Sequence, residues 1–503
     1  MFDIMKKKTF LLLLCIVPTA VFANVFDITK YGAVNDGKTV NTNVIQKAID
    51  DCTKKGGIVL VPSGSFVTGT IYLKSNVTLQ VDKGATLYGS IDTADYTPNA
   101  PTSISCPNTH DRNGKSKKNF GLIYAEGQEN IAITGDGTIN GNGDSKVFQK
   151  GDNGPARPKL IFLISCKNVK VSKIFLTNSA FWMQDYTACD GVYIDGIKVF
   201  NHTNFNQDGL DIDSKNVVVT NCIIDSDDDG ICLKSYIIDK PCENVTITNC
   251  VVATNCNAIK FGTPGYGGFK NIAINNISVN AASQSNFRNW TTRYKKITTD
   301  PSMVSGISLE CADGGTVDGV LINNVVMKAT QTPIFIKISN RQAKMHFDTT
   351  NRVAAMRNVI ISNIIADAHS RRTSSVTGYP GVYVENVQLK NIIINQYSIA
   401  AKDEVPGEVK ENEGGYPSTH MLGEVLPANV FYLRHVKDIL LEDVQVNLHG
   451  NDERTPVVIE DATGVQLKNI SVKKEASATK YIGASDVKTV TSSDIRVDGK
   501  NVN

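Results

Sequence analysis

A degenerate nine-residue pattern recurs along most of this chain and restricts what the chain can fold into. The pattern begins with Asn-Val or a close variant, alternates polar and apolar residues, and carries a second Asn at its sixth position. Clear copies begin at Asn168, Asn216, Asn244, Asn271, Asn358, Asn386 and Gly464. With a weaker copy at Gly191, the starts from Asn168 to Asn271 lie 23, 25, 28 and 27 residues apart. A repeat of this length is typical of a solenoid.

The alternation within each copy has a period of two, which indicates β-strands rather than helices. Asn, Gly and Asp separate the strands, and these residues accept the tight bends that a coil needs. A coil of three short strands uses about this many residues, and stacked coils pair their backbones in parallel. The sequence therefore predicts an all-β chain folded as a right-handed parallel β-helix. We expect the repeated asparagines to stack as hydrogen-bonded ladders at the corners.

The segment before the repeats predicts a cap for one end of the coil. A single helix is expected from about Thr42 to Lys55, opened by capping residues between Asn41 and Asn43. Such a helix covers the open end of the first coil, as terminal repeats of solenoids require. We expect residues 24–100 to form this cap and the first coils of a single catalytic domain that spans 24–503. Long gaps in the repeat at 281–305, 341–356 and 398–427 predict loops beside the site or over one end.

The N-terminus and the charge balance bear on location and partners. Residues 1–23 begin with basic residues, continue with a short apolar run and end in Val-Phe-Ala, which predicts a cleaved signal peptide and a secreted or periplasmic protein. Without this segment the net charge of +2 falls to about 0, so no field favours nucleic acid or an anionic membrane. We expect no nucleic-acid partner, no membrane insertion and a monomer. Ten cysteines remain, and several suit small core positions.

Crowded aspartates mark the candidate site, in the stretch NFNQDGLDIDSKNVVVTNCIIDSDDDGICLKS from Asn204 to Ser235. Alternation places Leu210 and Ile212 inside the coil, with Ile231 and Leu233 inside the next one. The outward residues then form columns that continue on later coils: Asp211, Cys232, Lys260 and Ser308, and beside them Asp213, Lys234, Gly262 and Glu310. Neighbouring coils lie about 4.8 Å apart. Asp208, Asp228 and Asp229 are therefore predicted to converge on one exposed patch flanked by Lys234 and Lys260, with Asn257 next in line.

Several functions suit such a patch. Inverting glycoside hydrolysis needs one protonated carboxyl group and a carboxylate that activates water, and repulsion between the carboxylates raises one pKa as this requires. A Ca²⁺ site of the kind that serves a pectate lyase is a second interpretation. Solvated aspartates at a coil corner, or a carbohydrate-binding β-helix without turnover, are further alternatives. The fragment DSDDDG is not an EF-hand, because Tyr236 occupies its twelfth position and no helices flank it.

The mature chain resembles glycoside hydrolase family 28, the polygalacturonase-like β-helices, over almost its whole length. YGAVNDGKTVNTNVIQKAI and GGIVLVPSGSF are similar to the N-terminal segment of many pectin-degrading β-helices. NQDGLDID resembles the family's Asn-x-Asp motif at Asn206 and Asp208, and DDGICLKS its Asp-Asp motif at Asp228 and Asp229. The resemblance implies an inverting hydrolase of α-galacturonosidic bonds that needs no metal or other cofactor. Asp228 would be the general acid, while Asp208 and Asp229 would hold and activate the water.

Two departures from the family pattern concern the substrate. Asn257 stands where the family's Gly-His-Gly motif has histidine, and Ser308 and Glu310 replace the basic residues of its Arg-Ile-Lys motif. A glutamate would repel a galacturonate on the leaving side, so a neutral leaving sugar, as in rhamnogalacturonan, is one alternative to polygalacturonan. Lys234 and Lys260 could hold a galacturonate on the other side. The missing charge could also come from Lys337 or Arg341 on the next coil.

Overall fold

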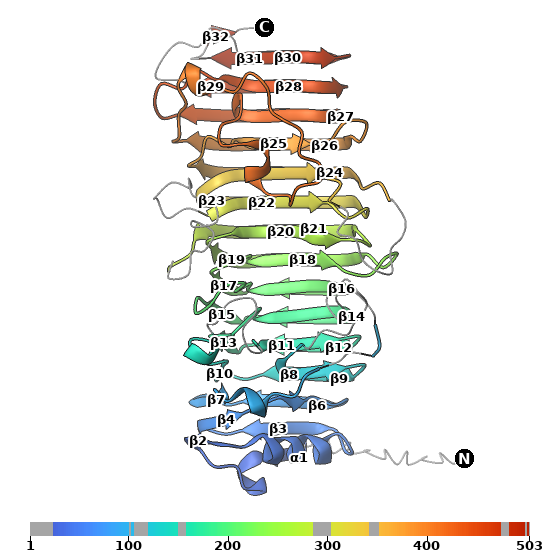
Figure 1. Cartoon of the computed structure of the whole chain (residues 1–503), viewed down its shortest axis with the longest axis vertical. Helices are drawn as coiled ribbons and strands as arrows, with labels where there is room; N and C mark the ends of the chain where they lie inside the picture. The colour runs from blue at the N-terminus through green and yellow to red at the C-terminus, as the bar shows by residue number, and fades with distance from the viewer. Residues whose placement is uncertain are drawn as a thin grey trace, which may run out of the picture.

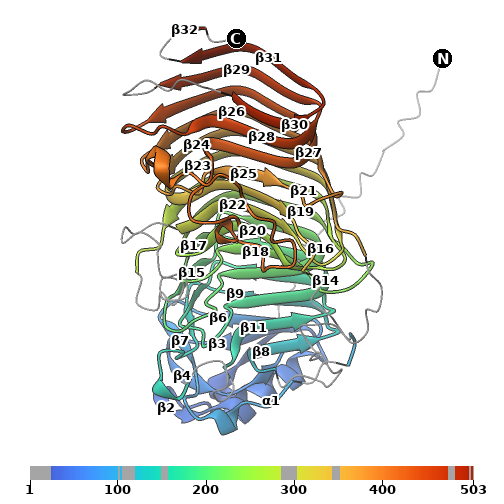
Figure 2. The same ribbon diagram turned by 45° about the horizontal axis from the view of Figure 1, so that its top comes forward.

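The computed structural model describes residues 24–99, 102–104, 119–148, 157–284, 303–341, 352–473, 482–497 and 500–501. The predicted signal peptide and most of two predicted loops, 285–302 and 342–351, lie outside these residues. The described chain winds into a stack of coils whose strands pair in parallel with those of the next coil, the right-handed parallel β-helix that the repeat predicts (Figure 1). The chain begins at one end of the stack and finishes at the other, as Figures 1 and 2 show.

Each coil contributes to three parallel ladders, and long strands bend at a corner to join two of them. We name the ladder that carries the aspartates the site sheet. Its strands are β5 (Ile71–Tyr72), β8 (Gly121–Glu126), β11 (Lys159–Ile164), the start of β14 (Gln184–Asp195), the start of β16 (Leu210–Thr220), β18 (Ile231–Ser235), β20 (Asn257–Gly265), β22 (Met303–Cys311), the end of β23 (Thr316–Ile338), β25 (Ser374–Thr377), the start of β27 (Ala428–Leu448), β28 (Thr455–Thr463) and β30 (Ile482–Val487).

The other two ladders close each coil. One contains β1 (Val25–Asp27), β3 (Gly57–Val61), β6 (Val77–Val81), β9 (Glu129–Thr134), β12 (Lys167–Ser172), β19 (Cys242–Thr254), β21 (Phe269–Ala281), β24 (Ala355–Ala368), β26 (Val384–Gln396), β29 (Val465–Lys473) and β31 (Val490–Val497). The third begins with β2 (Asp36–Val40), β4 (Gly64–Thr68), β7 (Ala85–Gly89), β10 (Thr138–Asn140), β13 (Phe175–Thr177), β15 (Lys198–Asn201) and β17 (Ile223–Ser226) and continues in the second halves of the long strands. β32 (Lys500–Asn501) turns back antiparallel to β31.

The corner asparagines form the predicted ladders. Asn244 donates to Asn216 at 3.0 Å and Asn271 donates to Asn244 at 2.8 Å, so each side chain bridges to the preceding coil. A second ladder joins Asn276 to Asn249 at 3.2 Å. These residues have φ between 52° and 58°, in the left-handed region that Asn tolerates better than most residues. The repeat thus specifies the bend and the contact between coils with the same residue.

The N-terminal helix α1 (Thr42–Cys52) covers the end of the coil, as predicted (Figure 1). Ile45 and Ile49 are fully buried on the face that packs against the first strands. The helix ends at Cys52, before the predicted Lys55, because the chain turns toward Gly56 and Gly57, whose φ values are 69° and 153°. Asn41 is the residue before the helix but makes no side-chain cap. Its amide instead bonds Val34 and Thr39 and pins the preceding loop.

The remaining short elements are 3₁₀ turns, and they lie in the segments between strands. They are η1 (Ile28–Tyr31), η2 (Thr93–Asp95), η3 (Lys146–Phe148), η4 (Lys402–Glu404) and η5 (Thr419–Leu422). The nine cysteines that the structure describes are all free and buried, which fits the expected role of several as small core residues. Among the described residues, no helix has the length and apolar character needed to cross a membrane.

Candidate active site

Parallel pairing brings the two aspartate motifs onto adjacent coils. Leu210 pairs with Ile231 and Ile212 with Leu233, and the next coil continues with Ile259 opposite Ile231. The backbone N–H of Gly209 donates to the carbonyl of Asp229 at 2.9 Å, so Asp208 and Asp229 lie side by side. The N–H of Gly230 donates to the carbonyl of Asn257 at 2.8 Å, which puts Asn257 next in the row. The register predicted from alternation is therefore confirmed at these positions.

The two Asp-Gly pairs have a steric reason. A Cβ on Gly209 would meet a methyl of Ile224 at 2.5 Å and the carbonyl oxygen of Gly230 at 2.7 Å. A Cβ on Gly230 would meet Val252 at 2.4 Å and the carbonyl of Ala258 at 2.9 Å. Glycine is needed at both positions because the coils approach closely where the strand enters the site sheet. The catalytic candidates are thus anchored by tight backbone packing directly after them.

The prediction of an exposed patch is wrong. Asp208, Asp228 and Asp229 face out of the coil, but they are only 3%, 5% and 3% exposed. Lys234, Lys260 and Asn257 lie against them on the same and the next coil. Carboxyl groups held this far from water have pKa values set by burial as well as by their neighbours.

Each of the two predicted lysines neutralises a different part of the cluster. Lys234 lies 3.1 Å from Asp211 and 3.8 Å from Asp208, and it is 5% exposed. Lys260 lies 3.0 Å from Asp229 and is 4% exposed. Burying these ammonium groups is costly unless they are paired, so their charges are retained by the carboxylates beside them.

Asp228 and Asp229 are neighbours in sequence but have opposite pKa shifts. Burial, and then the charges of Asp208 and Asp229, raise the pKa of Asp228 well above its ordinary value. Burial also acts to raise the pKa of Asp229, but Lys260, Lys234 and a 2.7 Å hydrogen bond from Asn257 outweigh it and leave that pKa below its ordinary value. The two pKa values therefore lie apart, so one carboxyl group can hold a proton at a pH at which the other is ionised. Burial, opposed by Lys234, raises the pKa of Asp208 to about 6.

Asn257 does occupy the position predicted next to the aspartates. Its amide nitrogen donates to Asp229, and its amide oxygen accepts a 2.6 Å hydrogen bond from Ser305 on the following coil. The side chain is held at both ends, so it presents a fixed donor to the ionised carboxylate. A neutral amide here helps to keep Asp229 charged without bringing a titrating group into the cluster.

Glu310, which the sequence predicts on the leaving side, lies next to Lys260, which the sequence predicts on the other side. Glu310 is 1% exposed, accepts from Ser308 at 2.7 Å and lies 4.0 Å from Lys260. Burial raises the pKa of Glu310 to about 7, opposed by Lys260 and Ser308. Below this pH the side chain is largely neutral, so the repulsion of a galacturonate expected from the sequence is weak in mildly acidic solution.

Lys337 and Arg341, which the sequence offers as sources of the missing positive charge, differ in where their charged groups lie. Lys337 pairs with Glu310 along the ladder, but its ammonium group donates to the carbonyl of Gly378 at 2.5 Å. Arg341 makes a two-point ion pair with Asp313, with its Nε and Nη2 atoms 3.0 and 2.8 Å from the carboxylate. Its guanidinium also lies 5.6 Å from the ring of Tyr416, and its charge lowers the pKa of Glu310. Of these two residues, Arg341 is the one whose charge acts on Glu310.

Tyr416 and Trp182 belong to the site but were missed in the sequence. Lys260 donates to the hydroxyl of Tyr416 at 3.1 Å, whereas the residue as a whole is 47% exposed. Trp182 stacks on Phe181, with ring centroids 5.0 Å apart, and Lys234 lies 4.7 Å from its ring. Aromatic faces are apolar surfaces on which sugar rings can pack. Tyr416 lies in a segment flagged only as a loop, and nothing local indicated that it would reach Lys260.

Asn206 lies near Arg157 and the aromatic rings of Phe181 and Phe205. It has a φ of 53°, and its amide oxygen accepts from Arg157 at 3.2 Å. The guanidinium of Arg157 lies 4.5 Å from the ring of Phe181 and 3.9 Å from that of Phe205. Asn206 therefore contacts Arg157, whose guanidinium lies over the rings of Phe181 and Phe205.

A divalent cation fits this cluster poorly. Oxygen atoms of Asp228 and Asp229 and the sulfur of Cys256 lie within 4.8 Å of one another. Ca²⁺ requires six to eight oxygen ligands, whereas this group offers a thiol as its third member. Lys260 already lies 3.0 Å from Asp229, where a cation would be repelled.

The described chain is thus a parallel β-helix that brings three buried carboxyl groups together on its site sheet. Residues 52–408 match the family model "Glycosyl hydrolases family 28", and the chain belongs to this family. The structure is similar to an exopolygalacturonase from Thermotoga maritima, with a TM-score of 0.58 and 20% identity over 74% of this chain and 87% of that one. This likeness shows the fold alone.

Curated relatives carry related names. The chain is 31% identical to an exo-poly-alpha-D-galacturonosidase of Dickeya chrysanthemi over 42% of this chain and 42% of that protein. It is 31% identical to an endo-polygalacturonase of Pectobacterium parmentieri over 59% of this chain and 71% of that protein. The chain thus matches less than half the length of the Dickeya protein, and both exo- and endo-acting names occur among its relatives.

Proposed function

We propose that this protein is an exported inverting glycoside hydrolase that cuts α-galacturonosidic bonds in pectin. The observation that carries the proposal is the meeting of Asp208, Asp228 and Asp229 on adjacent coils, with Lys260 and Asn257 in contact with Asp229, because an inverting mechanism needs one acid and one base. Asp228 keeps its proton and gives it to the glycosidic oxygen of the leaving sugar. Asp229 and Asp208 bind the water and accept its proton as its oxygen attacks the anomeric carbon.

Charged and aromatic groups on both sides of the aspartates support a uronate-containing substrate. Lys234 and Trp182 lie on one side, and Lys260, Arg341 and Tyr416 lie on the other. Ammonium and guanidinium groups recognise carboxylates, and the aromatic rings offer faces for sugar rings. Both polygalacturonan and rhamnogalacturonan satisfy this description, and Arg341 favours a charged leaving sugar. Substrate choice is decided by comparing the two polymers directly.

The segment 398–427 supports exo action. It crosses the site sheet in front of later coils (Figure 1), and Tyr416 ties it to Lys260 in the site. A segment in this position limits how far a bound chain can extend along the sheet. Sizing of products over time tests this point, because a ladder of intermediate lengths would contradict exo action.

The catalytic roles are tested with Asp228→Asn on homogalacturonan and rhamnogalacturonan. Removing a general acid reduces kcat by about 10²- to 10⁴-fold, and Asp190→Asn, a corner aspartate that bonds Asn216, serves as the control. Unchanged turnover by Asp228→Asn would refute the assigned role.

Two further measurements distinguish the alternative functions. Loss of activity in excess chelator, together with an ultraviolet-absorbing unsaturated product, would identify a Ca²⁺-dependent lyase instead. Tight binding with no product from any pectic substrate identifies a non-catalytic binding protein.

Export follows from the predicted signal peptide in residues 1–23, and a single domain and a monomeric state complete the proposal. Detection of a mature N-terminus at Asn24 outside the cytoplasm tests the proposed export. Sedimentation of the purified protein tests the proposed monomeric state.

A further inference from the structure

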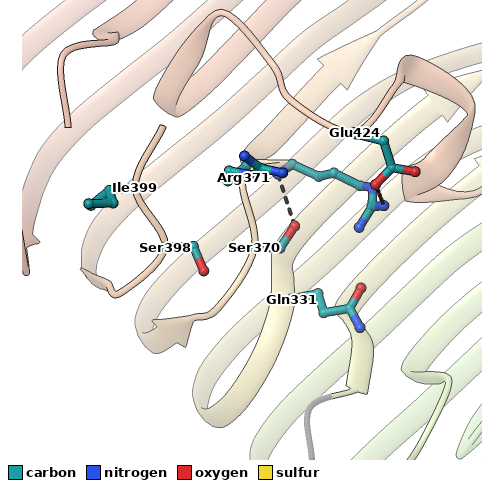
Figure 3. A pocket seen from close by; sticks show the side chains of 7 residues that line it. Gln331, Ser370, Arg371, Ser398, Ile399 and Glu424 are labelled. Atoms are coloured by element: carbon teal, nitrogen blue, oxygen red, sulfur yellow. Dashed lines mark hydrogen bonds and ion pairs between the residues drawn. The ribbon is translucent and has the colours of Figure 1, made fainter. Parts of the chain in front are cut away.

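A pocket lies just before β25 enters the site sheet, between this turn and the segment 398–427 (Figure 3). Its volume is about 280 Å³, near the lower end for small-ligand pockets. The lining residues are Gln331, Ser370, Arg371, Arg372, Ser398, Ile399 and Glu424. We propose that this pocket binds the carboxylate of a uronate unit in the pectic chain, at a distance from the bond that is cut. The choice of ligand rests on the proposed function.

The pocket lies on the same row as the aspartates. Asn257 pairs with Ser305, Ser305 pairs with Thr332, and the hydroxyl of Thr332 donates to the carbonyl of Arg372 at 2.6 Å. Counting from Asp229, Arg372 is therefore four coils further along. At about 4.8 Å per coil this places it about 19 Å from Asp229 in the direction of the helix axis. An oligosaccharide that extends along the row reaches it.

The backbone that carries the two arginines is rigid. Three consecutive carbonyl groups accept hydrogen bonds from buried side chains: Ser370 from Gln396 at 2.9 Å, Arg371 from Arg454 at 2.7 Å and Arg372 from Thr332 at 2.6 Å. Gln396 and Arg454 are each 1% exposed, and Thr332 is fully buried. A binding site works best when its groups are held in place before the ligand arrives.

The arginines still have binding capacity. Arg372 is 4% exposed and donates through Nη2 to Glu424, while its Nε has no hydrogen-bond partner. The side-chain oxygen of Gln331, which is 2% exposed, also has none. An arginine presents five donors that match a carboxylate at two points. A uronate carboxylate fits the Nε and Nη2 edge, and the amide of Gln331 suits a sugar hydroxyl.

The existing acidic partners are replaceable. Glu424 is 48% exposed and Glu404, which pairs with Arg371 at 2.5 Å, is 44% exposed. The exposed pair of Arg371 with Glu404 contributes little free energy. A ligand carboxylate can take the place of Glu424 because it keeps the buried guanidinium of Arg372 paired. The side chain of Arg371 is 37% exposed and Ile399 is 44% exposed, which opens the pocket to solvent and offers an apolar face to a sugar ring.

Calorimetric titration of the inactive Asp228→Asn protein with oligogalacturonates of increasing length tests the inference. Adding Arg372→Gln should weaken binding of the longer oligosaccharides about ten- to a hundredfold, the loss expected for a hydrogen bond to a charged group. Digalacturonate, too short to reach the pocket, should bind both proteins equally. Carboxyl-reduced oligosaccharides should also bind both equally. Arg357→Gln, in an exposed ion pair with Asp318, is the matched control and should change nothing.

Several results would overturn the inference. One is that the Asp228→Asn protein binds oligogalacturonates of every length equally well with and without Arg372→Gln. Another is that Arg372→Gln weakens binding of carboxyl-reduced oligosaccharides as much as binding of the unreduced ones. An equal loss for digalacturonate would mean that Arg372 only holds the segment 398–427. Partial recovery by Arg372→Lys, with an unchanged melting temperature, supports the inference and excludes misfolding. If the unmodified protein cleaves no pectic substrate, the proposed function fails, while a length-dependent effect of Arg372 on binding still supports the pocket.

Discussion

At the scale of single residues, the adjacent side chains of Asp228 and Asp229 have different contacts and therefore different pKa values. Asp228 and Asp229 are adjacent and equally buried, yet Lys260 and Asn257 contact Asp229 directly. Those contacts stabilise the charged form of Asp229, while Asp228 receives mainly the cost of burial and the repulsion of its neighbours. Proton placement in this cluster therefore depends on partners supplied by the next coil.

Glu310→Gln should stabilise the protein at neutral and higher pH. The ordinary pKa of 4.5 applies to the unfolded chain, whereas burial raises the folded pKa to about 7. Between these values the unfolded chain loses the proton while the folded protein keeps it, so stability falls as pH rises. Above pH 7 the accumulated cost is about 3 kcal/mol. Urea unfolding should show this gain for Glu310→Gln above pH 7 and no gain near pH 4.

The control for this prediction is Glu385→Gln, because the side chain of Glu385 is 48% exposed. Its free energy of unfolding should differ little from that of the parent at either pH. If Glu310→Gln behaves in the same way as the control, the side chain of Glu310 is solvated and its predicted titration is wrong.

At the scale of elements, the segment 398–427 is attached to the site sheet by buried polar contacts. Arg454 and Asp452, both with fully buried side chains, form a 2.6 Å ion pair just before β28. Arg454 also donates to the carbonyls of Arg371, Leu426 and Ala428. One side chain thus joins the arginine pocket, the end of the segment and the start of β27.

Arg454→Met should destabilise the protein by about 3–5 kcal/mol, because it leaves Asp452 charged, buried and without its partner. Arg357→Met removes an exposed partner of Asp318 and should cost no more than about 1 kcal/mol. Chemical denaturation of both variants measures the difference. Similar midpoints for the two would show that water reaches Asp452 and that the pair is not structural. Proteolysis within 398–427 should increase in Arg454→Met alone.

At the scale of the whole molecule, the stack needs a cover at the end where the coil begins. The strands of the first coil have backbone groups that would pair with another chain if they were exposed. α1 prevents this contact through Ile45, Ala48 and Ile49, all of which are fully buried. We therefore expect chains to associate through this end when the helix is lost.

Ile49→Glu should release α1 and expose this end, with a loss of at least about 3 kcal/mol and association between chains. Lys47→Glu, on the exposed face of the same helix, also adds a glutamate and should leave the protein as it is. Size-exclusion chromatography with light scattering distinguishes the two. A monomeric, stable Ile49→Glu protein would show that the helix is dispensable as a cover.

The sequence by itself determined the β-helical coil, the parallel pairing of its strands and the row of aspartates. Strand alternation has a period of two, and parallel pairing transmits that period from one coil to the next, so the pairings of Leu210, Ile231 and Ile259 could be derived from spacing. The corner asparagines were equally predictable, because their conformation and their hydrogen bonds are local.

Only the tertiary structure decided how deeply the aspartates lie, which of them keeps its proton, and what surrounds them. The contact of Tyr416 with Lys260 and the pocket around Arg372 both depend on the path of 398–427. That segment has no repeat, so no periodic pattern fixes where its side chains go. Its position follows from individual long-range contacts, such as those of Arg454, and these become visible only in the folded chain.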